Sequence, residues 1–101
     1  MNKIIFFCFI IFISFSLFAK DNIKPKNGYV PDEQTAIKIA VAIWIPIYGE
    51  KQIESEKPYK ATLKNGIWTV TGKLPEGYEG GTAIAEITKE TGCIIRVIHE
   101  Q

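Results

Sequence analysis

The chain has 101 residues, and its 12 Lys and Arg residues nearly balance its 11 Asp and Glu residues, for a formal net charge of +1. A chain of this length forms one domain. The balanced charge argues against a nucleic-acid partner, because domains that bind nucleic acid carry a clustered excess of basic residues. We therefore expect a single small domain that does not bind nucleic acid.

The first segment, residues 1–19, has the composition of an export signal. Lys3 supplies a positive charge, residues 4–18 are Ile, Phe, Leu and Cys broken by two serines, and Ala19 precedes a polar run. This order predicts a signal peptide that is cleaved near Ala19 and releases the mature protein into the periplasm. The alternative is an uncleaved membrane anchor, because Leu17 stands where cleavage sites favour a small residue. The membrane would then be contacted through the leader alone.

The remaining chain is short and cannot form a disulfide bond within itself. Residues 20–28 are polar and are predicted to form a flexible tether, which leaves 29–101 as the domain proper. Loss of the leader removes Cys8 and leaves Cys93 without a partner in the chain, so no disulfide can form within the chain. Stability must come from the packing of side chains.

A long helix is predicted after Pro31 and Asp32. The carboxylate of Asp32 can accept hydrogen bonds from the free backbone N–H groups at a helix start. Apolar residues then recur three and four positions apart over 36–47, which is the spacing of a buried helix face. Pro46 predicts the end or a kink of this helix, and a short polar helix is expected over 50–56.

Two β-hairpins are predicted next. Strands 59–64 and 67–73 flank Asn65-Gly66, the dipeptide most typical of a two-residue type I′ turn. Counting outward from this turn places Leu63 opposite Trp68 on one face. The second hairpin pairs 82–88 with 93–99 through a turn that contains Gly92.

These elements predict an α+β domain in which a long N-terminal helix and a short helix pack on a curved four-stranded antiparallel sheet. The predicted core combines large apolar residues of the helix and of the first hairpin with one small helix residue. Its members are Ile37, Ala40, Trp44, Tyr59, Leu63, Trp68 and Val70.

Few side chains could support a nucleophilic enzyme. After residue 19 the chain has one serine, Ser55, one histidine, His99, and one cysteine, Cys93. Cys93 and His99 lie on the same predicted strand, about 20 Å apart at ~3.3 Å per residue, so they cannot form a dyad. A pair of Ser55 and His99 would still need a carboxylate to orient the imidazole. We expect no catalytic residue and no enzyme activity.

Glu50 and Glu54 lie one helical turn apart, which is a spacing that could serve acid and base roles in glycoside hydrolysis. Lys51 and Lys57 stand among them, however, and favour a solvated face of mixed charge. A lone His99 without a zinc motif predicts no metal site. We expect no cofactor.

The loop Leu74–Gly81 is the candidate surface for a protein partner. It contains three glycines but lacks the lysine of a phosphate-binding loop and leads into a strand. Its tyrosine beside acidic residues is a composition found in protein interfaces; the alternative is an ordinary connector between the hairpins. The candidate binding residues are Pro75, Glu76, Tyr78 and Glu79.

Several motifs recur in order between Gly28 and Glu100. They are Val-Pro-Asp at 30–32, Ile-Trp-Ile-Pro-Ile-Tyr-Gly at 43–49, Lys-Pro-Tyr at 57–59, and Leu-Lys-Asn-Gly-Ile-Trp at 63–68. With them the chain resembles the bacterial immunity proteins that have a nuclear transport factor two fold, which is also described as cystatin-like. The resemblance implies a non-enzymatic protein that binds and neutralises a cognate toxin of a polymorphic toxin system. No residue inherits a role from it.

An export signal combined with this resemblance implies a toxin that acts in the cell envelope. A competing hypothesis is an exported module similar to PepSY domains, whose helix carries a pattern like Ala-Ile-Lys-Ile-Ala at 36–40 and which binds or restrains peptidases. A cystatin-like peptidase inhibitor is a third, although the glycine-valine inhibitory hairpin of cystatins is missing.

Overall fold

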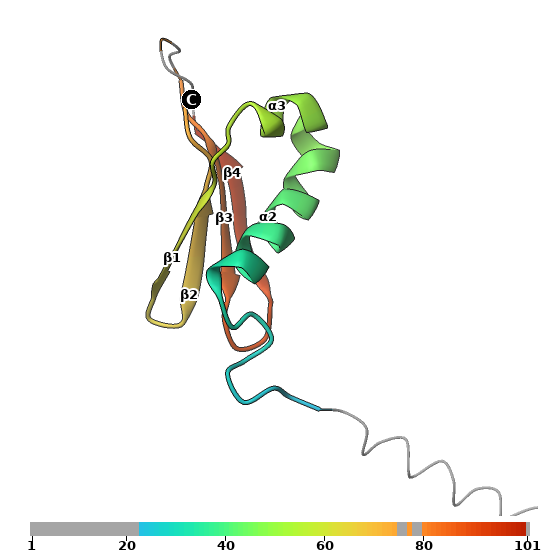
Figure 1. The fold of residues 1–101 in the computed structure, drawn as a ribbon, viewed down its shortest axis with the longest axis vertical. Helices are drawn as coiled ribbons and strands as arrows, with labels where there is room; N and C mark the ends of the chain where they lie inside the picture. The colour runs from blue at the N-terminus through green and yellow to red at the C-terminus, as the bar shows by residue number, and fades with distance from the viewer. Residues whose placement is uncertain (1–22, 75–76, 78–79, 101) are drawn as a thin grey trace, which may run out of the picture.

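The structure, a computed structural model, describes residues 23–74, 77 and 80–100. Within these residues two helices lie on one face of a four-stranded antiparallel sheet (Figure 1), so the predicted α+β architecture is confirmed. The helices are α2 (Glu33–Tyr48) and α3 (Glu50–Glu54), and the strands are β1 (Lys60–Lys64), β2 (Ile67–Thr71), β3 (Ala83–Thr88) and β4 (Ile94–His99). The predicted leader, 1–19, lies outside the described residues.

Helix α2 begins at the predicted cap. The Oδ1 atom of Asp32 accepts hydrogen bonds from the hydroxyl of Thr35 at 2.7 Å and from its backbone N–H at 2.8 Å. These two bonds lower the pKa of Asp32 below its ordinary value, because they favour the charged carboxylate. The helix continues past Pro46 and ends at Tyr48, and the N–H of its C-cap residue, Gly49, donates to the carbonyl of Ile45 at 2.8 Å.

The sheet is a meander with the strand order β1-β2-β3-β4. The register counted from the first turn is confirmed, with Leu63 opposite Trp68. Asn65 and Gly66 have φ angles of 52° and 78°, the positive values that a type I′ turn requires of both residues. In the second hairpin the β3–β4 register shifts between Glu86 and Ile87, as at a β-bulge.

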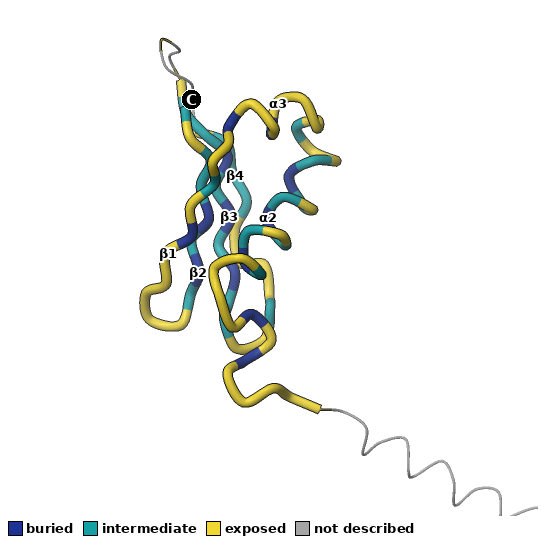
Figure 2. Tube along the Cα trace, viewed as in Figure 1, coloured by how far each residue is buried: buried dark blue, intermediate teal, exposed yellow. Residues whose placement is uncertain are grey.

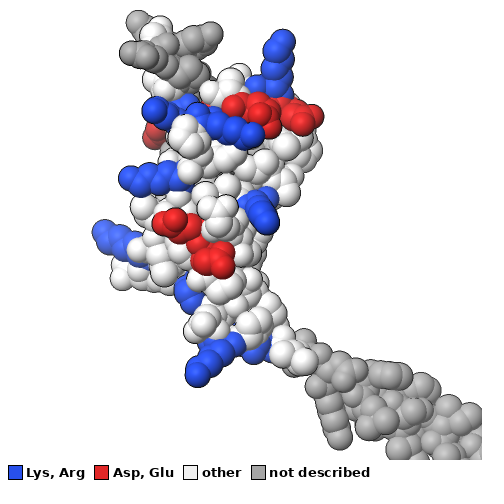
Figure 3. All heavy atoms as spheres, viewed as in Figure 1, with Lys and Arg blue, Asp and Glu red and all other residues white. Residues whose placement is uncertain are grey.

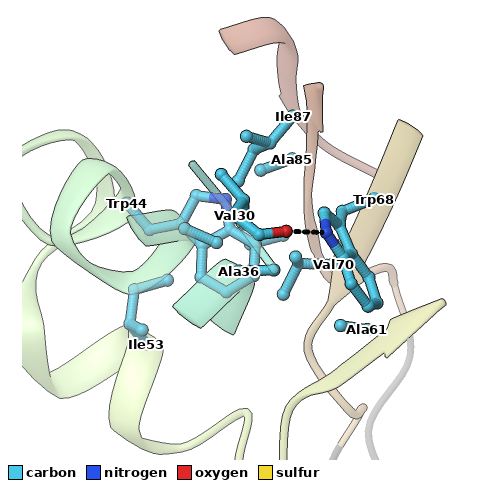
Figure 4. Packing of buried hydrophobic residues seen from close by; sticks show 11 residues of the cluster. Val30, Ala36, Trp44, Ile53, Ala61, Trp68, Val70, Ala85 and Ile87 are labelled. Carbon is cyan, nitrogen blue, oxygen red and sulfur yellow. Dashed lines mark hydrogen bonds between the residues drawn. The ribbon is translucent and has the colours of Figure 1, made fainter. Parts of the chain in front are cut away.

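The core lies between α2 and the sheet, where the buried residues of both face one another (Figure 2). Trp44 fills the space beside the sheet, and alanines on both elements allow the helix to approach closely (Figure 4). Of the predicted core residues, Ala40, Trp44, Trp68 and Val70 are buried, and Ile37 and Tyr59 are partly buried against them.

Leu63 is 45% exposed, so its prediction as a core residue is wrong. It does share the inner face with Trp68, as counted. However, β1 is an edge strand and Leu63 lies beside its hairpin turn, so the side chain has a strand neighbour on one side alone. The register determines which face of the sheet Leu63 occupies. Its burial also requires another element to cover that corner of the sheet.

The segment before α2 is held against the β3–β4 turn. The N–H groups of Tyr29 and Val30 donate to the carbonyls of Glu90 and Lys89 at 3.1 and 3.0 Å. Lys24 forms an ion pair with Glu90 at 3.0 Å. Within the predicted tether, 20–28, Lys24 thus contacts the β3–β4 turn, while residues 20–22 lie outside the described range.

The membrane-anchor alternative rests on the leader alone. Within the part of the chain that the structure describes, none of the helices is both long enough and apolar enough to cross a bilayer.

Candidate functional site

A buried carboxylate lies at the end of the sheet where α3 meets β3 and β4. Glu56, which follows α3, is 1% exposed. Its Oε1 atom accepts a hydrogen bond from the N–H of Ala83 at 2.8 Å, and its Oε2 atom accepts one from the amide of Gln52 at 2.8 Å. The Nε2 atom of His99 lies 2.9 Å from the same Oε2. Both carboxylate oxygens are thus bound.

These contacts decide the charge of Glu56. Burial acts to raise its pKa, because a charged group loses hydration in the interior. The hydrogen bonds from Ala83, Gln52 and His99 outweigh burial, so the pKa of Glu56 lies below its ordinary value of 4.5. Glu56 is therefore a carboxylate at neutral pH.

His99 is bound at both ring nitrogens. Its Nε2 faces Glu56, its Nδ1 lies 3.0 Å from the carbonyl oxygen of Glu100, and its ring packs against that of Tyr48 with the centroids 5.1 Å apart. A carboxylate and a carbonyl oxygen are hydrogen-bond acceptors, so both ring nitrogens of His99 face acceptors. Both ring nitrogens are therefore engaged by neighbouring groups.

Gly72 makes room for this carboxylate. A Cβ atom built on Gly72 would collide with the side chain of Glu56. The neighbouring N–H of Lys73 donates to the carbonyl of Glu56 at 2.6 Å. The chain after β2 therefore passes directly over Glu56, and this close approach requires glycine.

Replacing Gly72 with alanine should lower the free energy of unfolding by about 1–3 kcal/mol, because the added methyl group displaces a buried, hydrogen-bonded carboxylate. Urea denaturation followed by circular dichroism measures the change. Lys73→Ala, at the exposed neighbouring position, is the control and should change stability far less. Equal effects of the two substitutions would contradict the close approach.

The sequence-predicted catalytic candidates do not converge. The hydroxyl of Ser55 donates to the carbonyl of Gln52 at 2.6 Å, and Cys93 is exposed before β4. Among the described residues, no hydrogen bond joins His99 to either nucleophile, and no group of three or more His, Cys, Asp or Glu residues could hold a metal ion. Glu54 pairs with Lys57 at 3.1 Å on the surface, which confirms the predicted face of mixed charge.

A family model described as NTF2 fold immunity protein matches residues 35–101, which include nearly all of α2 and every strand. The chain belongs to this family. An uncharacterized protein, YbbC of Escherichia coli (strain K12), is 40% identical over 82 residues, which is 80% of this chain and 66% of that protein. No solved structure matches the chain.

Immunity proteins of this family are generally non-enzymatic. The helices packed on one antiparallel sheet are consistent with an NTF2-like fold. In this NTF2 fold immunity protein, Glu56 and its partners Gln52, Ala83 and His99 form what we call the buried cluster. Its hydrogen bonds fasten the end of α3 to β3 and β4.

The predicted partner-binding residues, Pro75, Glu76, Tyr78 and Glu79, lie outside the described residues. Both ends of their loop are described. Lys73 contacts Glu56 through its N–H, and Thr82 accepts a hydrogen bond from the N–H of Glu100 at 3.0 Å. The loop thus joins β2 to β3 at the same end of the sheet as the buried cluster (Figure 1).

Sequence reasoning missed Glu56. Glu56 and His99 lie 43 residues apart in the chain, so no local pattern joins them. One signal was available: Gly72 occurs at the end of a strand that otherwise alternates apolar and polar residues, and a glycine there indicates that another group approaches the backbone closely. The identity of that group could not be read from the sequence.

Proposed function

We propose that this immunity protein binds a cognate protein toxin of interbacterial competition and neutralises it in the cell envelope. The match of the immunity family to residues 35–101 carries the proposal. The described side chains support neutralisation by binding and not by catalysis, because both nitrogens of His99 and the hydroxyl of Ser55 are engaged in structural hydrogen bonds.

The envelope is proposed from the leader. Residues 1–19 have the pattern of an export signal, and an exported immunity protein meets its toxin outside the cytoplasm. The proposed target is therefore an effector that damages the wall or the membrane. Cleavage near Ala19 would release the domain into the periplasm, and retention of the leader would tether the same domain to the membrane.

The loop Leu74–Gly81 remains a proposed contact with the toxin. Pro75, Glu76, Tyr78 and Glu79 combine an aromatic ring with acidic groups, a composition suited to the polar rim of an interface. The described ends of the loop, fixed by Lys73 and Thr82, would hold it at one end of the sheet.

Co-expression tests the function. The toxin encoded beside this gene is exported in a sensitive host, with the full chain or with a variant that lacks residues 1–19. We expect the full chain to restore growth, the leaderless variant to fail, and the purified mature protein to co-elute with the toxin. The proposal is wrong if neither form restores growth and the purified proteins do not associate. Co-elution with a neighbouring peptidase instead would favour the PepSY-like or cystatin-like hypothesis.

A further inference from the structure

The sheet has a second face, which we call the outer face: the side chains of β1–β4 that point away from α2. Both described helices lie on the opposite side of the sheet (Figure 1). Side chains alternate along a strand, so Thr69 belongs to the outer face because it lies between buried Trp68 and Val70. In β3, Ile84 and Glu86 alternate with buried residues in the same way.

The charge on the outer face is unbalanced. Lys60 and Lys64 on β1 and Arg96 on β4 are exposed, and no described residue forms an ion pair with any of them. Of the residues in the four strands, all of them described, Glu86 is the one acidic side chain, and it lies opposite Arg96 in the register. In Figure 3 Lys and Arg side chains project on the β1 side of the molecule; acidic side chains lie beside basic ones over α3 and again near the start of α2. The outer face therefore carries three basic side chains and one acidic one, although the charge of the whole chain is nearly balanced.

The outer face also carries apolar side chains toward its two ends, while the row across its middle is polar, with Thr69 opposite Glu86 and Glu86 opposite Arg96. Ile84 lies opposite Ile98 in the register, and Ile67 occupies the outer face at the start of β2; all three are partly exposed. At the adjoining edge, Ile95 of β4 is 48% exposed. Partly exposed apolar side chains beside charged ones are a composition found in protein interfaces.

We propose that the toxin docks on the outer face, through an acidic surface that also carries apolar side chains. This inference rests on the proposed function and assigns its surface. The lysines of β1 and Arg96 would meet carboxylates, and the isoleucines of β2, β3 and β4 would meet apolar side chains. A second copy of this chain does not fit, because two outer faces in contact would bring these basic side chains together, and juxtaposed like charges are unfavourable at an interface.

Charge reversal tests the surface. The triple variant Lys60→Glu, Lys64→Glu, Arg96→Glu should weaken binding of the neighbouring toxin by about 30-fold or more and abolish protection. Lys38→Glu with Lys51→Glu, two exposed positions on the helices, is the matched control and should change affinity by less than about 3-fold. Affinity of the wild-type protein should also fall with added salt, and affinity of the triple variant should not.

Arg96→Glu places a second carboxylate opposite Glu86, which can destabilise the sheet, so the double variant Lys60→Glu, Lys64→Glu is measured as well. It should retain the unfolding transition of the wild type and lose about 10-fold in affinity. Full binding by both variants overturns the outer-face assignment and leaves the proposed function intact. Failure of the wild-type protein to bind or protect overturns both.

Two further measurements identify a different occupant. Sedimentation of the wild-type protein that shows a dimer lost in the double variant would assign the face to a second copy. Charge-dependent binding to vesicles of phosphatidylcholine mixed with phosphatidylglycerol, but not to vesicles of phosphatidylcholine alone, would assign it to a membrane. Either result overturns the docking of a toxin there.

Discussion

Replacing Trp68 with alanine should lower the free energy of unfolding by about 3–5 kcal/mol. The indole is 5% exposed on the inner face of β2, and its Nε1 atom donates to the carbonyl of Val30 at 2.8 Å (Figure 4). Truncation therefore leaves a cavity in the core and a carbonyl without its partner, and it removes one of the hydrogen bonds that hold the segment before α2 to the sheet. Urea denaturation followed by circular dichroism gives the value.

Two controls separate these contributions. Trp68→Phe keeps a large ring but removes the hydrogen bond to Val30, so it should cost about 1–2 kcal/mol. Leu63→Ala removes the residue directly opposite in the register; because Leu63 is 45% exposed, the loss should stay below about 1 kcal/mol. A loss of less than about 1 kcal/mol for Trp68→Ala would contradict the placement of the indole in the core.

Those features of the fold that depend on neighbouring residues could be predicted from the sequence. The cap at Asp32 needs an acceptor three residues before its donor, and Asn65-Gly66 supplies the two positive φ angles of its turn. Once that turn is fixed, the register of β1 against β2 follows by counting, which is why Leu63 was placed opposite Trp68 correctly.

Features that depend on distant residues could not be predicted. The exposure of Leu63 depends on whether any other element covers the corner of an edge strand, and the β3–β4 turn that binds Tyr29 and Val30 lies about sixty residues further along the chain. The candidate surface shows the same division. The strand alternation that places Lys60 and Lys64 together is local, but their position on the same sheet face as Arg96 requires the order of all four strands.

Glu56→Ala should lower the free energy of unfolding by about 3 kcal/mol. The substitution leaves the N–H of Ala83, which is fully buried, without an acceptor, and it removes the hydrogen-bond partner of His99. Glu56→Gln keeps an oxygen for Ala83 but loses the charge, so its cost should be smaller, about 1–2 kcal/mol. Denaturation at neutral pH measures both. If Glu56→Ala and Glu56→Gln lowered the free energy of unfolding equally, the hydrogen bond from Ala83 would not contribute to stability.

The charge of Glu56 also predicts how stability depends on pH. Its pKa is lowered in the folded protein, so the unfolded chain binds the proton more tightly. The stability that Glu56 contributes is therefore fully present above the ordinary carboxyl pKa of 4.5 and is lost as the pH falls below it.

Glu56→Gln, which cannot titrate, should lose less stability than the wild-type protein between neutral pH and pH values below 4.5. Asp32→Asn is the control, since it removes the other carboxylate with a lowered pKa at an exposed position. If the wild-type protein and Glu56→Gln lost the same stability on acidification, the buried carboxylate would not be the group whose protonation loosens α3 from the sheet.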